Sequence, residues 1–564
     1  MALPTITTQP AVEPTTENAP VKEQAFGGGL EGAQRTSRET VQWFPSLRSP
    51  DNLINPLKPM ADARGRDTVQ NDGYAQGVVA IHRDSIVGSC YRLNAQPDYR
   101  VIGADQSWAD EFQQVVEARF NLIAESDACW LDAARMNTLT GLVRMAIGGF
   151  VVTGEVLATS EWLKKGNRPV RTAFQLISPD RLSNPWGTMD TRYLRRGINK
   201  DGNGRPISAW IRQGYPFEGY PDMLQFKWVE VPFEKPWGRK QVIHIIEQLL
   251  PDQSRGVSDM VAALKQMRMT KNFQDVTLQS AVVAASYFAS IESELPPAEV
   301  MTQMGAGQTV PDNLANSPWG QALGWYMQAL QTFYGNGKNV TIDGAKIPVF
   351  MPGTKLNMQQ AGTPGGVGTA FETSLLRHIA AALGVSYEEL SRDYSQVSYS
   401  SARASALGTR RFMMARKKLV ADRFASIVYT NVLEEEIANG NVPLPPGRKR
   451  DHFYEPLMRE AYSKCTWIGA SAGQINELDE TQAAILRVKA GLSTYEKEIA
   501  KLGEDFREVF AQRAREEGII KKLGLAFSLD AQKTGNQMTS GNLSGEDANG
   551  AATANPNKKG GRTE

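Results

Sequence analysis

Residues 398–418, SYSSARASALGTRRFMMARKK, place hydroxyl side chains ahead of a run of basic ones, and these residue types suit contact with phosphates. On a helix that turns about 100° per residue, Arg403, Arg410 and Lys417 recur every seven positions and form one stripe, which Arg411 widens. Apolar residues gather on a neighbouring face that could pack against protein: Ala402, Ala406, Met413, Val420 and Phe424. The stripe is therefore either an ordinary solvated basic face or a surface that meets phosphates.

The segment GASAG, residues 469–473, matches the G-x-S-x-G pattern of a nucleophile elbow, with Ser471 as the nucleophile. That fold needs a catalytic histidine after the serine in the chain. All four histidines come earlier: His82, His244, His378 and His452. We therefore expect a Gly/Ser loop rather than a catalytic site.

Three glycine-rich segments also resemble phosphate-binding loops. GTPGGVGT at 362–369 and GNGKN at 335–339 lack the Gly-Lys-Ser/Thr ending that a P-loop uses to bind phosphates and magnesium, so we expect flexible connectors. DGNGRP at 201–206 is better explained as a hairpin turn than as a dinucleotide-binding motif. None of these segments therefore indicates a nucleotide-binding site.

The histidines and carboxylates of the sequence do not indicate metal binding or acid/base catalysis. No two histidines share a local ligand spacing, and His244, inside the apolar VIHII, is typical of a hydrogen-bonded core histidine. Carboxylates such as Glu388, Glu389 and Asp201 have no partner that the sequence places in a cleft. The sequence therefore predicts no catalytic residues, no cofactor and no metal.

The length and composition of the chain limit the classes of protein to which it can belong. A chain of 564 residues is expected to form about three or four structural units. Lys plus Arg (62) nearly balance Asp plus Glu (61), so any DNA contact must be local or weak. Three widely spaced cysteines predict neither disulfides nor a zinc cluster and fit a reducing cytoplasm. With no secretory signal and no run of 18 or more apolar residues, we expect a soluble protein that spans no membrane.

The order of elements predicts an α+β protein. Apolar spacing predicts helices over 105–125 and 137–149, and a strand over 150–160. Residues 172–245 favour β structure, with a hairpin turn at Asp201-Gly202. The terminal stretches 1–35 and 530–564 are rich in small and polar residues and are expected to be mobile.

The second half of the chain is predicted to be mainly helical. Residues 256–292 would form a helix roughly 50 Å long, with small residues over 281–289 that let neighbouring helices approach. A Pro/Gly-containing excursion, a returning helix, a hairpin and a Gly-rich connector follow, at 294–320, 321–334, 344–360 and 361–369. Further helices are expected over 371–393, along the basic segment past Val432, and within 474–524.

Several of these stretches resemble the tailed-phage portal proteins of the lambda type. LISPDRLSNP, GINKDGNGRPISAWI and VIHIIEQLLPDQSRGVSDM resemble, in that order, consecutive segments of the family's β-rich middle. MPGTKLNM, LLRHIAAALGVSYEELSRD and VSYSSARASALGTRRF are similar to its later core. The resemblance covers roughly residues 45–525, whereas 213–240, 294–340 and the loop GQINELDE depart from it.

The resemblance implies a portal-protein fold, mainly helical with a β-rich wing, long stem helices and a helical C-terminal crown. It implies a ring of about twelve subunits around a channel for double-stranded DNA. The divisions expected on this basis are a disordered N-terminal tail (1–40), a wing with the β-rich middle (41–255), stem helices (256–340) with a clip at 294–320, a wing return with a channel loop (391–401) and the basic helix (341–450), a helical crown (451–525) and a disordered C-terminal tail (526–564).

The implied function is that of a portal vertex protein, which packages and ejects DNA and docks the packaging motor and then the tail connector. Its expected partners are the terminase motor, the major capsid and scaffolding proteins and the head-tail connector proteins, in the virion and, during assembly, in the host cytoplasm. The DNA-channel candidates are Ser395, Gln396, Ser398, Tyr399, Ser400, Ser401, Arg403, Arg410, Arg411 and Lys417. The alternatives are a packaging-machinery enzyme, either an ATPase motor or a capsid protease, and a head-tail adaptor.

Overall fold

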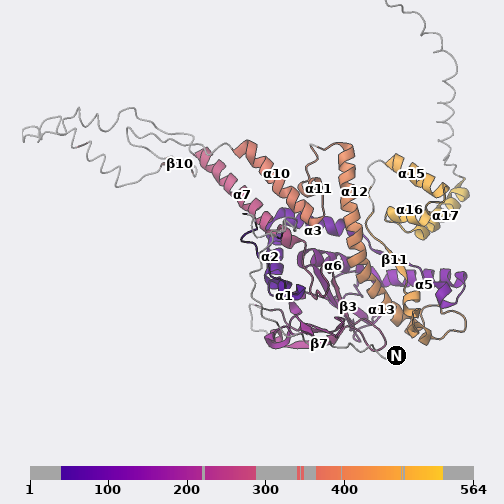
Figure 1. The fold of residues 1–564 in the computed structure, drawn as a ribbon. Coiled ribbons are helices and arrows are strands. Elements are labelled where there is room, and N and C mark those ends of the chain that lie inside the picture. Colours follow the sequence, from indigo (N-terminus) through magenta and orange to yellow (C-terminus); the bar gives the residue numbers. More distant parts are fainter. Residues whose placement is uncertain are drawn as a thin grey trace, which may run out of the picture.

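The computed structural model describes residues 33, 38, 40–216, 218, 223–286, 325, 340–342, 345–347, 364–395, 397–471, 473 and 477–524. It confirms a mixed helix and sheet protein, with a body from which two helices extend (Figure 1). The predictions for the terminal tails, for the excursion at 294–320 and for nearly all of the returning helix at 321–334 lie outside the described residues.

The N-terminal part is mainly helical. Its elements are α1 (Pro50–Ile54), α2 (Lys58–Asn71), α3 (Gly73–Ile86), β1 (Arg92–Ala95), α4 (Tyr99–Ile102), α5 (Gln106–Ala124) and α6 (Leu139–Thr153). α5 and α6 confirm the helices expected over 105–125 and 137–149. Each buries an apolar stripe, which includes Phe112 and Phe120 on α5 and Val143 and Ile147 on α6.

The strand predicted over 150–160 is wrong in its first part. α6 continues to Thr153, and Gly154 then reverses the chain with a φ of +77°. A Cβ atom at Gly154 would lie 2.2 Å from the backbone carbon of Val257, so the close approach of these two segments requires glycine. The strand β2 begins only at Glu155 and ends at Trp162.

Two antiparallel sheets form the β-rich middle. In the first, β2 lies between β3 (Thr172–Ile177) and β8 (Val242–Ile246). The second has the order β4 (Leu194–Arg195), β5 (Ile198–Lys200), β6 (Pro206–Arg212) and β7 (Trp228–Pro232). The turn predicted at Asp201-Gly202 is confirmed between β5 and β6, where the Asp201 carboxylate accepts hydrogen bonds from the backbone N–H groups of Asn203 and Arg205.

Short 3₁₀ turns connect the strands of this region: η2 (Pro179–Arg181), η3 (Pro185–Gly187) and η4 (Met223–Phe226).

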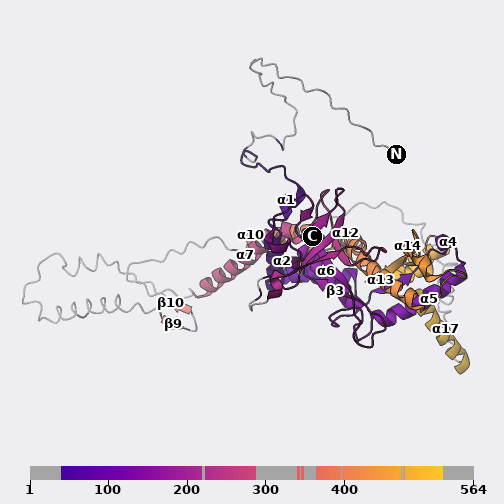
Figure 2. The ribbon, with the colours of Figure 1, turned by 90° about the horizontal axis from the view of Figure 1, so that it is seen from below.

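The two extended helices are α7 (Met260–Ser286) and α10 (Pro364–Leu383), which run side by side away from the body (Figures 1 and 2). Their contacts include the ring edges of Phe273 and Phe371, with centroids 5.6 Å apart. Between them in the chain lies the short hairpin of β9 (Val340–Ile342) and β10 (Ala345–Ile347), so the hairpin predicted over 344–360 begins earlier than expected.

The Gly-rich connector predicted over 361–369 is wrong from residue 364 onward, because α10 begins at Pro364. Proline is well tolerated in the first turn of a helix, where its missing N–H has no partner to lose. The helix predicted over 371–393 is interrupted instead at Gly384, which has a φ of +66°. Ser386 then starts the short helix α11 (Tyr387–Ser391) with a capping box to Glu389.

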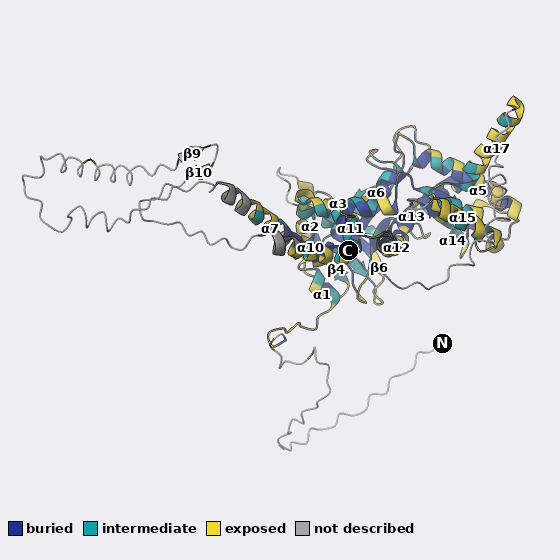
Figure 3. Ribbon diagram, turned by 90° about the horizontal axis from the view of Figure 1, so that it is seen from above, coloured by how far each residue is buried: buried dark blue, intermediate teal, exposed yellow. Residues whose placement is uncertain are grey.

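The basic segment forms α12 (Tyr399–Arg416), a π-helical turn η5 (Lys417–Asp422) and α13 (Arg423–Asn439), so the helical run continues past Val432 as predicted. α13 crosses the apolar core, where Phe424, Val428 and Tyr429 are fully buried (Figure 3). The chain then passes through η6 (Arg450–Tyr454) and α14 (Met458–Tyr462) to β11 (Cys465–Ile468), which pairs with β1.

Three further helices confirm the helical prediction for the C-terminal stretch: α15 (Glu477–Lys489), α16 (Tyr495–Lys501) and α17 (Phe506–Leu523). They lie beside the body near α5 (Figure 1).

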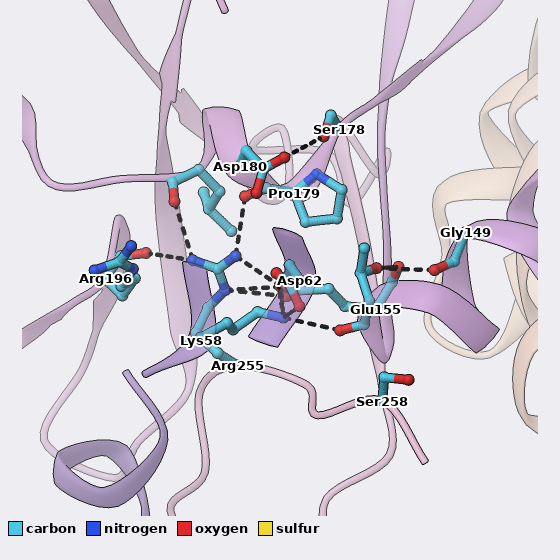
Figure 4. Close-up of polar contacts among 12 residues, drawn as sticks. Lys58, Asp62, Gly149, Glu155, Ser178, Pro179, Asp180, Arg196, Arg255 and Ser258 are labelled. Atoms are coloured by element: carbon cyan, nitrogen blue, oxygen red, sulfur yellow. Dashed lines mark hydrogen bonds and ion pairs between the residues drawn. The ribbon is translucent and has the colours of Figure 1, made fainter. Parts of the chain in front are cut away.

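A cluster of buried charges lies where the chain leaves the body for α7 (Figure 4). The carboxylate of Glu155 ion-pairs with Arg255 at 2.7 Å and with Lys58 at 2.9 Å, and its second oxygen lies within hydrogen-bond distance, 2.8 Å, of Nε2 of His244. Burial opposes ionisation of Glu155, but the charges of Arg255 and Lys58 hold its pKa well below the usual range. His244 is therefore a hydrogen-bonded core histidine, as predicted.

Candidate nucleic-acid interface

The predicted channel loop connects α11 to α12 at the end of α12 that stands away from the body (Figure 1). Ser398 caps α12 by accepting a hydrogen bond from the backbone N–H of Ser401. Its hydroxyl also lies 3.2 Å from that of Ser400 and 2.9 Å from that of Ser401. The sequence folds this way because serine side chains satisfy the free N–H groups of a first helical turn.

Four of the candidate hydroxyls are exposed: Ser395, Ser398, Ser400 and Ser401. Gln396 and the side chain of Tyr399 lie outside the described residues, although the backbone of Tyr399 starts α12. The loop therefore presents a group of small donors and acceptors to solvent.

The same loop carries a carboxylate. Asp393 accepts a hydrogen bond from the backbone N–H of Ser395 at 3.0 Å, and its hydrogen bonds with Ser395 lower the pKa of the carboxyl. Arg392, directly before it, adopts a left-handed conformation with a φ of +58°. In this turn a carboxylate therefore lies next to the hydroxyl-bearing Ser395.

Arg403 and Arg410 lie on one face of α12, as the seven-residue spacing predicts, and line a cleft of about 580 Å³. Its other walls include Glu389 of α11, Glu480 of α15 and Lys501 of α16. Arg403 is exposed and Arg410 is half-buried. The cleft therefore mixes both signs of charge and is not a uniformly basic surface.

Arg411 is exposed but is not among the residues that line this cleft. The basic stripe is thus divided between the cleft and open solvent.

Lys417 requires a correction, because it is buried in the body and does not continue the exposed stripe. Its Nζ atom lies 2.6 Å from a carboxylate oxygen of Asp422 and donates to the backbone oxygen of Trp467 at 2.9 Å. It also lies 5.2 Å from the ring centroid of Tyr91, whose hydroxyl bonds the same Asp422 carboxylate. The π-helical turn brings Lys417 and Asp422, five residues apart, into contact, and a 3.6-residue pattern does not anticipate that contact.

The neighbouring Arg416 is buried for a similar reason. Its guanidinium ion-pairs with Asp259 at 2.7 Å and Glu247 at 3.2 Å, and lies over the rings of Phe150 and Phe412. The base of α12 is therefore fixed to the segment that leads into α7. Sequence spacing could not show this, because the partners lie more than 150 residues away in the chain.

The cleft residues Glu389, Glu480 and Lys501 were not predicted as part of this site. Their only sequence signal is a position on amphipathic helices, which does not specify the facing element.

Ser471 lies in the loop that follows β11, where its hydroxyl accepts a hydrogen bond from the N–H of Gly473 at 3.3 Å. The predicted Gly/Ser loop is confirmed, because α15 begins only at Glu477. Among the described residues, no group of three or more His, Cys, Asp or Glu side chains could hold a metal ion. No helix in the described part of the chain has the length and apolar character of a membrane span.

Comparison with known proteins identifies the family. A sequence model described as phage portal protein, lambda family, matches residues 36–417. Portal protein B of Escherichia phage lambda is 38% identical over 491 residues, which cover 87% of this chain and 88% of the relative. The portal protein of Escherichia phage N15 is 38% identical over 501 residues, covering 89% and 90%.

More distant similarities are also found. A probable portal protein of Halomonas phage phiHAP-1 is 21% identical over 489 residues, covering 82% of this chain and 80% of the relative. A chain in the neck of an empty GTA particle, computed with C6 symmetry, matches with a TM-score of 0.39 and 13% identity over 78% of this chain and 92% of that one. On the family match and the two relatives of 38% identity, the chain belongs to the lambda family of phage portal proteins.

Proposed function

We propose that this portal protein forms a ring of about twelve subunits at one capsid vertex, and that the ring encloses a channel for double-stranded DNA during packaging and ejection. The observation that carries the proposal is the family match over residues 36–417, together with 38% identity to portal protein B along nearly the whole chain. The terminase motor and then the head-tail connector proteins would dock on the ring, and the capsid and scaffolding proteins would surround it. The chain would act in the host cytoplasm during assembly and in the virion afterwards.

The proposed subdomains follow the observed elements. The sheets built from β2 to β8 would form the wing, α7 and α10 the two sides of the stem, and α15 to α17 the crown. The proposal gives the chain no reaction of its own, since ATP hydrolysis would belong to the docked motor.

In this proposal the loop between α11 and α12 lines the channel. A conduit must let DNA slide, and every neutralised phosphate releases counterions and increases affinity. The exposed hydroxyls of Ser395, Ser398 and Ser400 suit this requirement, because they contact phosphates without neutralising them. The nearby carboxylate of Asp393 further limits the net positive charge of the loop.

Native mass spectrometry of the purified protein, with negative-stain images of the same sample, tests the ring. We expect a closed ring of about a dozen copies with a central hole. A persistent monomer in the presence of scaffolding and capsid proteins would contradict the proposal.

A charge-reversal variant tests the DNA role of α12. Arg403→Glu combined with Arg411→Glu is expected to reduce DNA packaging or retention in an assembled capsid, because it adds repulsion toward phosphates. The matched control is Lys164→Glu with Lys165→Glu, two exposed lysines in the turn between β2 and β3. If the α12 variant packages and retains DNA as well as the control, these arginines belong to an ordinary solvated face.

A further inference from the structure

The three C-terminal helices, which we call the C-terminal unit (residues 477–524), have no buried residue along α15, α16 or α17. Within the described part of the chain, no residue after Trp467 belongs to the apolar core. Five large apolar side chains of the unit are 62–80% exposed, namely Leu478, Leu486, Leu492, Tyr495 and Leu523. Figure 3 shows this contrast between the buried body and the exposed α17. The unit is therefore not attached to the body by the apolar burial that holds the body together.

The unit is attached instead to the outer face of β1. Side chains of a strand alternate between its two faces, and Leu93 and Ala95 face the core. The polar residues Arg92 and Asn94 face the other way, toward α16 and α17. Arg92 ion-pairs with Glu508 at 2.5 Å and more loosely with Glu504 at 3.9 Å.

Glu496 of α16 makes the second contact with this strand. One of its carboxylate oxygens accepts hydrogen bonds from the side-chain amides of Asn94 at 2.6 Å and Gln96 at 3.1 Å. Acidic side chains of the unit thus meet a basic residue and two amide donors of the body.

A third set of contacts joins α17 to α5. The guanidinium of Arg507 donates to the side-chain oxygen of Gln113 at 2.8 Å and lies 3.5 Å from Asp110. Beside these contacts, α5 and α17 line a cleft of about 690 Å³. The unit therefore rests on the body mainly through polar contacts, of which Asn94 is buried, and a cleft lies beside the contacts to α5.

Such an interface is weak. Exposed ion pairs contribute little to stability because water competes with them, and salt screens them further. Polar interfaces within a chain leave relative motion as the normal expectation. Internal contacts keep the unit together, since Glu498 ion-pairs with both Arg487 and Lys501, and the ring of Phe510 contacts those of Tyr495 and Phe506.

We propose that the C-terminal unit is a detachable element, which leaves β1 and α5 and docks again while the body stays folded. Arg92, with its acceptors Glu504 and Glu508, is the ion-pair latch that sets this equilibrium. The inference rests on these contacts alone and does not depend on the proposed function.

Hydrogen exchange of the full-length protein, read by mass spectrometry, tests the latch. Arg92→Glu is expected to accelerate exchange across residues 495–523 by about tenfold, because reversal replaces two attractions by two repulsions. Exchange in α6 and β2 should not change. Raising the salt concentration from 0.05 to 0.5 M should accelerate exchange in the same residues of the wild type, since screening weakens the latch.

Two further variants separate undocking from other causes. Arg513→Glu reverses a charge on the same helix that ion-pairs only with Glu517 among the described residues, so it tests simple fraying of α17 and should have a much smaller effect. Arg92→Glu combined with Glu508→Arg restores one attraction and should recover most of the protection.

The result that overturns the proposal is exchange over 495–523 that is the same in Arg92→Glu as in the wild type. An increase shared by α6 and β2 would overturn it as well, because the unit would then open only with the body. Should Arg92→Glu fail to fold, Glu508→Gln removes the same ion pair from the unit's side. It should accelerate exchange over 495–523 alone, by about threefold.

Discussion

Arg255 and Glu155 form a two-fold hydrogen-bonded ion pair, in which Nη2 and Oε1 are 2.7 Å apart and Nε and Oε2 are 3.0 Å apart. Both side chains are almost completely buried. Arg255 lies five residues before α7, and Glu155 begins β2 directly after the reversal at Gly154. The guanidinium also donates to the backbone oxygens of Pro179, Leu182 and Arg196. The pair therefore fixes the start of α7 to both sheets of the body.

We expect Glu155→Gln to destabilise the fold by about 3 kcal/mol or more, because it leaves the buried cations Lys58 and Arg255 without their anion. Chemical denaturation followed by far-UV circular dichroism measures the loss. Glu161→Gln is a suitable control on the same strand, since Glu161 lies at the solvent-facing end of β2 and should cost less than about 1 kcal/mol. Equal losses in the two variants would contradict a central role for the buried pair.

Glu117 of α5 should make stability depend on pH. Burial raises its pKa to about 7, above the usual 4.5. The pKa of Glu117 is higher in the folded state than in the unfolded chain. The contribution of Glu117 to the free energy of unfolding is therefore fully present below about pH 4.5 and is lost as the pH rises through 7.

Glu117→Gln keeps an acceptor for the Ala95 N–H and removes the titration. Between pH 5 and pH 8, the free energy of unfolding of the wild type should fall by roughly 2 kcal/mol more than that of the variant. Denaturation curves across this range, compared with those of Glu111→Gln at an exposed position of the same helix, give the measurement. Parallel pH profiles for all three proteins would show that Glu117 does not titrate there.

Lys417 should act in stability and not in DNA contact. Lys417→Ala leaves the buried Asp422 without its nearest cation and should destabilise the fold by about 3 kcal/mol. Arg411→Ala, at an exposed position of α12, should change stability by less than about 0.5 kcal/mol. Thermal unfolding of the two variants measures both changes, and a Lys417→Ala variant as stable as the wild type would contradict the structural role of Lys417.

Gly384, which follows α10, and Gly408, within α12, should respond to substitution by alanine in opposite directions. At Gly384 a Cβ atom would lie 2.5 Å from the ring of Phe412, and the φ of +66° already disfavours a side chain. Gly384→Ala is therefore expected to cost more than about 2 kcal/mol. Gly408→Ala, at a helical position with no atom within 4 Å of the new Cβ, should stabilise the protein by up to about 1 kcal/mol. Chemical denaturation measures the change in the free energy of unfolding for each variant. Changes of the same sign in both variants would contradict this prediction.

Local pattern was sufficient for much of the fold. The apolar spacing of α5 and α6, the Asp201-Gly202 turn and the helical C-terminal stretch follow from the propensities of adjacent residues, and all are observed. The family resemblance also followed from sequence, since it rests on short ordered segments.

The errors lie at positions that distant contacts decide. The end of α6 at Gly154 depends on the approach of Val257, and the break at Gly384 lies against Phe412. α10, which begins at Pro364, packs against α7 through partners such as Gln274 and Glu372, which are 98 positions apart in the chain.

For the candidate interface, the sequence by itself determined the helix, the hydroxyl group at its start and the alignment of Arg403 with Arg410. Only the tertiary structure decided that Arg416 and Lys417 turn into the body while Arg411 stays exposed. The physical reason is that helical spacing fixes the direction of a side chain, whereas its burial depends on the carboxylates and rings that other segments bring to it.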